Sequence, residues 1–180
     1  MTIDHKEQEV LAILDECLRQ KNVRETIEDI IPRITKKLHS EPQSIMAWET
    51  IPLELYGKKL PEFIKSGWIF ILRANTITGA ERHPNSRQRM VSYIGSADFQ
   101  IKVDGQWQSS LLSSEPDQAI EGRWMSIPVN VWHQGVVPEK DWFVASFHTV
   151  PAEQLIEERP DKDDPNSTRR KFYVGSDEKK

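Results

Sequence analysis

The feature that most constrains the fold is a long central stretch, Trp48 to Val150, in which short β-type runs alternate with turn residues. One run, Phe99 to Val103, has apolar residues at every second position and ends at Asp104-Gly105, a strong hairpin signal. Many short strands at this spacing indicate a β-sandwich or barrel. Besides this hairpin, strands are predicted over residues 68–75, 89–94, 123–127, 132–137 and 142–150.

The two flanking segments differ from this stretch. Residues 4–39 carry apolar side chains at three- and four-residue steps, which predicts two amphipathic helices. We expect residues 1–47 to form a helical segment that packs on the barrel, and residues 48–150 to form the barrel itself. Residues 151–180 are expected to hold one short helix and a partly disordered tail. Because the tail is charged and poor in apolar residues, its removal is expected to leave the domain stable.

The composition limits the classes of function. The chain has 180 residues, 37% of them hydrophobic, which suits one domain with an apolar core. The net charge of −4 and the lack of a basic stripe argue against a nucleic-acid partner, and the apolar runs are too short to span a membrane. The single cysteine, Cys17, cannot form an internal disulfide, and the N-terminus lacks the order of a secretion signal. A cytoplasmic location is therefore expected.

Two polar segments supply the candidate site residues. In the first, Glu81 and His83 are two residues apart, so in an extended strand their side chains share a face, about 7 Å apart. In the second, His133 follows a turn in which Asn130 can take the left-handed conformation that a tight corner needs. Both segments place side chains that can bind a ligand at the ends of strands.

The second segment resembles a motif of the cupin superfamily. That motif is a glycine, five residues, a proline, any residue, a glycine, two residues and a histidine. This sequence keeps the spacing with an asparagine in place of the inner glycine, whereas the final asparagine of the motif is replaced by Val137. The matching residues are Gly122, Pro128, Asn130 and His133.

The first segment resembles the other cupin motif, which has two histidines one residue apart, then a glutamate and a glycine. Counted back from Gly95, the glutamate falls on Gln88, the second histidine on His83 and the first on Glu81. A rival alignment takes His83 and Asn85 as the histidine pair, but it leaves one residue too few before Gln88. We prefer the first alignment.

The resemblance implies a mainly β fold, a double-stranded β-helix (cupin or jelly-roll) barrel with an N-terminal helical segment. It also implies a divalent transition metal (iron, zinc, manganese or nickel) bound by Glu81, His83 and His133, with Gln88 as a weak fourth ligand or a supporting donor. Many members of this fold have lost the metal. In that case Glu81, next to Arg82, is only a solvated charge at a strand end.

Four further residues are candidates for binding a small ligand. Arg89 and Arg123 belong to a group of arginines that favours an anionic ligand, although each can equally be a solvated residue that discourages edge pairing. Trp132 follows the turn of the second segment and is a candidate for a pocket wall. His148 either points into the barrel or forms a hydrogen bond at a strand end.

Two functions of different classes fit these features. The first is a small cytoplasmic metal-dependent enzyme, similar to a dioxygenase, that acts on a small organic acid. The second is a non-catalytic ligand-binding or sensor cupin that has lost its metal. In a third interpretation the helices form an interaction surface and the barrel is a scaffold. The apolar stripes of the helices also favour a homodimer.

Overall fold

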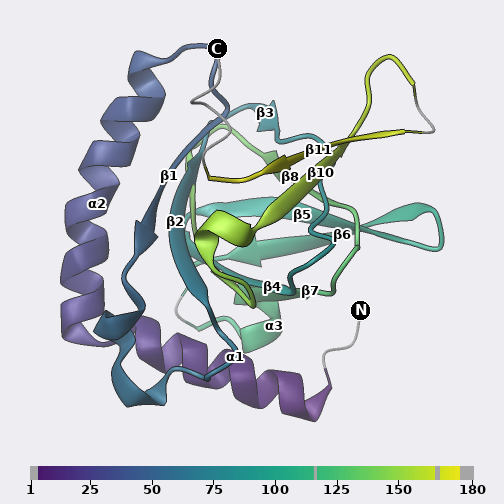
Figure 1. Ribbon diagram of the computed structural model, residues 1–180. Helices are drawn as coiled ribbons and strands as arrows, with labels where there is room; N and C mark the ends of the chain where they lie inside the picture. The colour runs from purple at the N-terminus through teal and green to yellow at the C-terminus, as the bar shows by residue number, and fades with distance from the viewer. Residues whose placement is uncertain (1–3, 116, 165–166, 175–180) are drawn as a thin grey trace.

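The computed structural model describes residues 4–115, 117–164 and 167–174. Two long helices, α1 (His5–Leu18) and α2 (Lys21–Ser40), come first and lie along one side of a β-barrel (Figure 1). Between the strands lie the short helical elements η1 (Leu53–Lys59) and α3 (Ile120–Arg123). No helix in the described part of the chain is long and apolar enough to cross a membrane.

The barrel has the strand pairing of a jelly roll. Its two antiparallel sheets have the strand orders β1-β2-β9-β4-β7 and β3-β8-β5-β6, with β1 (Met46–Ile51) at the edge of the larger sheet. The other eight strands pair first with last, which is the nested pattern of a double-stranded β-helix, so the predicted fold class is confirmed. The four pairs are β2 (Ser66–Leu72) with β9 (Trp142–His148), β3 (Thr76–Ile77) with β8 (His133–Val137), β4 (Gln88–Ile94) with β7 (Trp124–Ile127), and β5 (Ser96–Val103) with β6 (Gln106–Ser113).

Two tight turns form where the sequence predicts them. Asp104 and Gly105 have φ angles of 50° and 80°, the left-handed pair that a two-residue hairpin turn requires, and β5 pairs with β6 on either side. Asn130 has a φ of 70° at the corner before β8. This left-handed corner directs the chain back into the barrel at His133.

The larger sheet is covered on both faces. All seven residues of β2 are buried, because one face of the strand lines the barrel and the other packs against the helices. The apolar stripes of α1 and α2 belong to the core on this outer face, with members such as Leu14, Ile27 and Phe147. The chain therefore covers these stripes with its own sheet, and the homodimer stays a prediction.

The C-terminal segment differs from its prediction. The short helix expected after Pro151 is only a single turn, η2 (Ala152–Gln154), and the chain continues as an antiparallel hairpin of β10 (Ile156–Pro160) and β11 (Thr168–Phe172). The physical reason is charge pairing, because the buried Glu157 and Glu158 bind arginine and lysine side chains of the hairpin and the barrel. Part of the tail that was expected to be disordered, residues 165–166 and 175–180, lies outside the described residues.

Candidate metal centre

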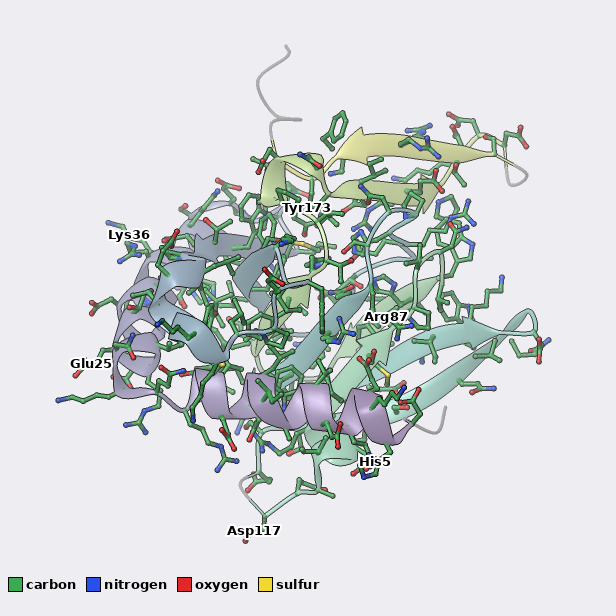
Figure 2. The ribbon with its side chains drawn as sticks, turned by 60° about the horizontal axis from the view of Figure 1, so that its bottom comes forward. His5, Glu25, Lys36, Arg87, Asp117 and Tyr173 are labelled. Atoms are coloured by element: carbon green, nitrogen blue, oxygen red, sulfur yellow. The ribbon has the colours of Figure 1, made fainter. Side chains whose placement is uncertain are left out.

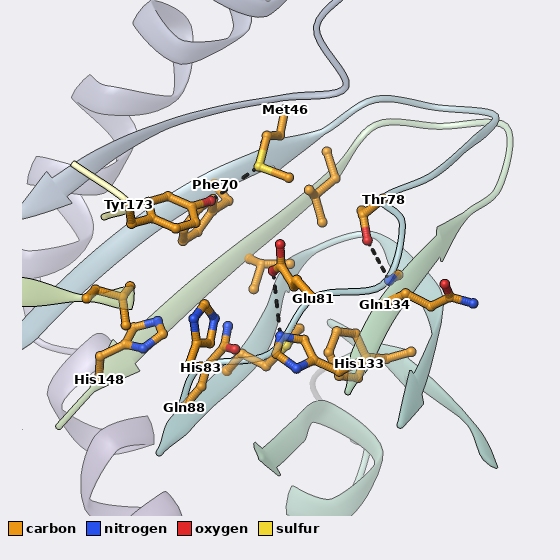
Figure 3. Close-up of a pocket in the computed structure, with 16 residues that line it drawn as sticks. Met46, Phe70, Thr78, Glu81, His83, Gln88, His133, Gln134, His148 and Tyr173 are labelled. Carbon is orange, nitrogen blue, oxygen red and sulfur yellow. Dashed lines mark hydrogen bonds and ion pairs between the residues drawn. The ribbon is translucent and has the colours of Figure 1, made fainter. Parts of the chain in front are cut away.

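The candidate site is built on a short extended segment between β3 and β4. Glu81 pairs with His133, the first residue of β8, through two backbone hydrogen bonds of 2.9 and 2.8 Å. Arg82 forms an equivalent pair with Glu158 of β10. Because side chains alternate along an extended segment, Glu81 and His83 line the barrel cavity (Figure 3), whereas Arg82 faces outward.

Both histidines present the same ring nitrogen to the cavity. Nδ1 of His83 lies 3.0 Å from the carbonyl oxygen of Ile156, and Nδ1 of His133 lies 3.0 Å from that of Val131. Since a carbonyl only accepts, Nδ1 of each ring carries a proton, and Nε2 is the ring nitrogen left for the cavity. Burial lowers the pKa of His83 to about 4, and the neighbouring His133 adds to this shift. Hydrogen bonds of this kind orient histidine ligands in metal sites.

Glu81 adds a carboxylate beside these nitrogens. Its Oε1 lies 3.6 Å from Nε2 of His133, and its Oε2 accepts a hydrogen bond from the guanidinium group of Arg159. Burial by itself raises the pKa of Glu81, but His133, Arg159 and His83 outweigh it and hold this pKa well below its usual range. One ligand atom from each of Glu81, His83 and His133 lies within 4.8 Å of the others. Two imidazoles and one carboxylate form a donor set that transition metals accept.

Two buried polar atoms in this region have no hydrogen-bond partner among the described residues, Nε2 of His133 and Oε1 of Gln88. The amide nitrogen of Gln88 donates to Oγ of Ser146 over 3.1 Å, so only its oxygen is left. An unpartnered buried acceptor costs about 1 to 3 kcal/mol. The two atoms therefore indicate that the cavity receives a further group.

His148 also lines the cavity, but its ring nitrogens are already engaged. Nδ1 lies 3.2 Å from Oγ of Ser86, and Nε2 lies 3.3 Å from Oγ of Ser146. Burial lowers the pKa of His148 well below its usual value, so the ring is neutral. His148 is thus part of the cavity wall and stands edge-on to His83, with 5.1 Å between the ring centres.

The cavity is small and mostly apolar. Its volume is about 50 Å³, enough for a few water-sized groups. The polar side chains converge on one region of the wall (Figure 3), and apolar side chains form most of the rest. The apolar wall consists of Met46, Phe70, Leu72, Met90, Phe99, Val144 and Leu155.

The two polar segments of the sequence meet in this cavity. Glu81, His83 and Gln88 come from the first segment and His133 from the second, and all four line one cavity inside a barrel with nested strand pairing. The fold is a cupin barrel. Asn85, which the rival alignment uses, instead bonds to the backbone of the C-terminal segment and does not line the cavity of the cupin barrel.

Comparisons with known proteins do not assign this chain to a family. No protein-family model matches the sequence, and no curated protein matches it. Similar solved structures include an oxalate oxidase in complex with the substrate analogue glycolate, with 11% identity and a TM-score of 0.46 over 62% of this chain and 54% of that one. The coconut allergen cocosin has 16% identity and a TM-score of 0.48 over 63% and 28% of the two chains. CapF, a capsular polysaccharide assembling protein from Staphylococcus aureus, has 12% identity and a TM-score of 0.48 over 72% and 30%.

This chain thus spans about half the length of the oxalate oxidase, 54%, and less of the other two proteins, 28% and 30%. Similarity at these identities concerns the fold alone. The function of the cupin barrel in this protein therefore has to be argued from its own side chains.

The C-terminal hairpin contributes to the site, which the sequence did not predict. Arg159 binds Glu81 and also donates hydrogen bonds of 2.8 Å to Glu157 and 2.9 Å to the carbonyl oxygen of Thr78. The ring of Tyr173, just after β11, lines the cavity from the other end of the hairpin (Figure 3). The hairpin therefore holds one candidate ligand in place and closes part of the cavity.

The structure does not bring Arg89 and Arg123, which the sequence suggested for binding an anionic ligand, to the cavity. Nε and Nη2 of Arg89 donate to Glu7 of α1 over 2.6 and 2.9 Å, and Arg123 donates to Asp15 of α1 over 2.6 Å. Arg89 lies outside the cavity because side chains alternate along a strand and its neighbour Gln88 points into the barrel. Both arginines instead attach α1 to the outer face of the larger sheet.

Trp132 also lies outside this cavity, and its role in binding a ligand stays a prediction. The guanidinium carbon of Arg82 lies 4.6 Å from the centre of the Trp132 ring, on the outward side of the extended segment. Trp132 lines a groove on the outer surface of the barrel.

Proposed function

We propose that the cavity binds one divalent transition metal (iron, zinc, manganese or nickel) through Glu81, His83 and His133, and that the protein is a metal-dependent enzyme of the dioxygenase type. The observation that carries this proposal is the buried Nε2 of His133, which has no hydrogen-bond partner among the described residues. It lies 3.6 Å from a carboxylate oxygen of Glu81. The imidazole of His83 completes a set of donors that these metals accept.

The chain's own residues fit this chemistry. A bound metal would supply open coordination positions and Lewis acidity. Glu81 provides a negative charge, which its lowered pKa maintains, and the hydrogen bonds at Nδ1 fix the orientation of His83 and His133. Gln88 has a free Oε1 with which it can accept a hydrogen bond from a bound molecule. The cavity is small and lined mostly by apolar side chains, which supports a small organic acid as the substrate.

A second candidate function is a metal-free cupin that binds a small ligand without catalysis. It is favoured by Arg159, because this guanidinium group already gives Glu81 a positive partner. In this case the free acceptors of His133 and Gln88 would receive hydrogen bonds from the ligand. A cytoplasmic location, as the sequence suggests, fits either function and stays a prediction.

Metal analysis separates the two functions. Protein purified without chelator, or titrated with Fe²⁺, Zn²⁺, Mn²⁺ or Ni²⁺, is expected to bind about one equivalent of metal. His133→Ala is expected to weaken this binding at least about 100-fold, because one of three protein ligands is lost. The matched control is His39→Ala, which removes an exposed histidine that pairs with Asp141 on the surface. Less than about a tenth of an equivalent with all four metals would leave only the metal-free function.

The Arg159→Gln variant tests how the hairpin supports the site. We expect about a tenfold loss of metal affinity, because the residue fixes Glu81 and replacement of such supporting groups typically costs 10- to 100-fold. Lys162→Gln, which changes an exposed cation of the same hairpin, serves as the control. Isothermal titration of both variants measures the effect. Tighter metal binding by Arg159→Gln would mean that the guanidinium competes for Glu81 instead of positioning it.

A further inference from the structure

A second and larger hollow lies on the outer surface, behind the segment that carries the candidate metal ligands. Its volume is about 430 Å³. Its walls come from that segment, from the hairpin β5–β6 and from the hairpin β10–β11, and both hairpins extend to the same side of the molecule (Figures 1 and 2). The groove is lined by Ala80, Arg82, Lys102, Trp107, Trp132, Pro160, Ser167 and Thr168.

Two cations of this groove keep donor groups free. Arg82 donates from Nε to Glu158 over 2.7 Å, but its two terminal nitrogens have no hydrogen-bond partner among the described residues. Nζ of Lys102 has neither a hydrogen bond nor an ion pair within the same residues. None of the groove residues is acidic, although the chain has 28 acidic side chains against 24 basic ones. The groove is therefore locally cationic and suited to an anion.

Aromatic rings lie directly beside these cations. The guanidinium carbon of Arg82 is 4.6 Å from the centre of the Trp132 ring, and Nζ of Lys102 is 5.8 Å from that of Trp107. Trp107 is 38% exposed, a large apolar side chain left open to solvent. Flat apolar surface and free cationic donors thus occur together, and a single ligand can use both.

We propose that this groove binds a small ring compound that carries a carboxylate or a phosphate. The oxyanion accepts hydrogen bonds from Arg82 and Lys102, and the ring packs on the indole of Trp107. The hydroxyl groups of Ser167 and Thr168 lie at the edge of the same groove. The groove is a separate site from the proposed metal centre, because the groove and the cavity share no lining residue.

The test uses the full chain and four probes. Glucose 6-phosphate, glucuronate and benzoate carry the anion on a sugar or an aromatic ring, and glucose is the neutral control. We expect at least one anionic probe to shift the indole N–H signals of Trp107 and Trp132 in NMR spectra, with a Kd of about 1 mM or below. Glucose is expected to leave both signals unchanged. Comparison of the three anions then identifies the ring and the charged group.

Variants connect this binding to the groove. Lys102→Gln is expected to weaken binding about tenfold, the effect of losing one charge-assisted hydrogen bond. Lys36→Gln, on the distant helix α2 (Figure 2), is expected to bind like the wild type. Arg82→Gln also removes the ion pair with Glu158, so only Lys102→Gln, whose ammonium group forms no hydrogen bond or ion pair within the described residues, decides the outcome. No shift with any anion at about 10 mM, or equal binding by Lys102→Gln, would overturn the proposal.

Discussion

A chain that ends at Pro151 is expected to melt about 10 °C below the full chain. The missing hairpin buries Leu155, which is 1% exposed, and packs Tyr173 against the rings of Trp48 and Trp68, with ring centres 5.7 and 5.5 Å apart. Removal of buried side chains of this size costs about 3 kcal/mol or more, which corresponds to about 10 °C for a domain of this length. Circular dichroism during heating measures the change. The composition of the tail alone predicts the opposite, namely that its removal leaves the stability of the domain unchanged.

A matched pair of point variants locates this effect within the hairpin. Tyr173→Ala is expected to lower the melting temperature by several degrees, because the ring leaves the aromatic cluster and opens the cavity wall. Phe172→Ala changes the adjacent residue, whose side chain is 56% exposed, and is expected to have almost no effect. Equal melting temperatures for the two variants would show that the hairpin does not depend on Tyr173 for its docking.

The Asp15→Asn variant is expected to lose about 2 kcal/mol or more of stability, a value between those of surface and buried ion pairs. Asp15 of α1 accepts hydrogen bonds of 2.6 Å from Arg123 and 3.0 Å from the indole of Trp124. Without its charge, the mostly buried guanidinium group of Arg123 is left without a counter-charge. Glu16→Gln, one residue along the same helix but exposed, is the control and is expected to change stability by less than about 0.5 kcal/mol. Urea unfolding of both variants measures the difference.

The same contacts make stability depend on pH. Burial raises the pKa of Asp15, but Trp124 and Arg123 outweigh it, and Arg89 has the same effect at Glu7, so both carboxyl groups have pKa values below their ordinary ones. The unfolded chain therefore takes up these protons first as the pH falls. Their contribution to stability is complete above about pH 4.5, the ordinary pKa of a glutamate, and is lost as the pH falls through the lowered values. A variant with both Glu7→Gln and Asp15→Asn is expected to lose less stability than the wild type over this range. An unchanged pH dependence would contradict this account.

The residues that the sequence places correctly are those whose position follows from the local backbone. Asp104-Gly105 determines the β5–β6 turn, and the two-residue spacing of Glu81 and His83 puts both side chains on one face of an extended segment. The same alternation excludes Arg89 from the cavity once Gln88 points inward. Local spacing is therefore sufficient for the candidate ligands and their neighbours.

The C-terminal hairpin depends on contacts between distant residues. Glu157 and Glu158 lie opposite Lys171 and Arg170, and in the sequence these charges look like those of a solvated tail. One local feature of the sequence does favour a hairpin here. An acidic pair is followed by turn residues and then by a basic run, and in an antiparallel hairpin these opposite charges face each other. Because Arg159 reaches Glu81 only through this hairpin, its role at the site could not be predicted.

The nested strand pairing also determines the order in which the protein can assemble. Ser66 of β2 pairs with His148 of β9, so a strand in which all seven residues are buried is synthesised long before its partner. We therefore expect slow folding. Until β9 is made, the nascent chain exposes an apolar strand that is paired on one side only, and such a strand can either aggregate or be bound by a chaperone. Glu81 and His133 meet only after β8 has been made. Any molecule that is held by both Glu81 and His133 therefore finds its complete site only after most of the barrel has been synthesised.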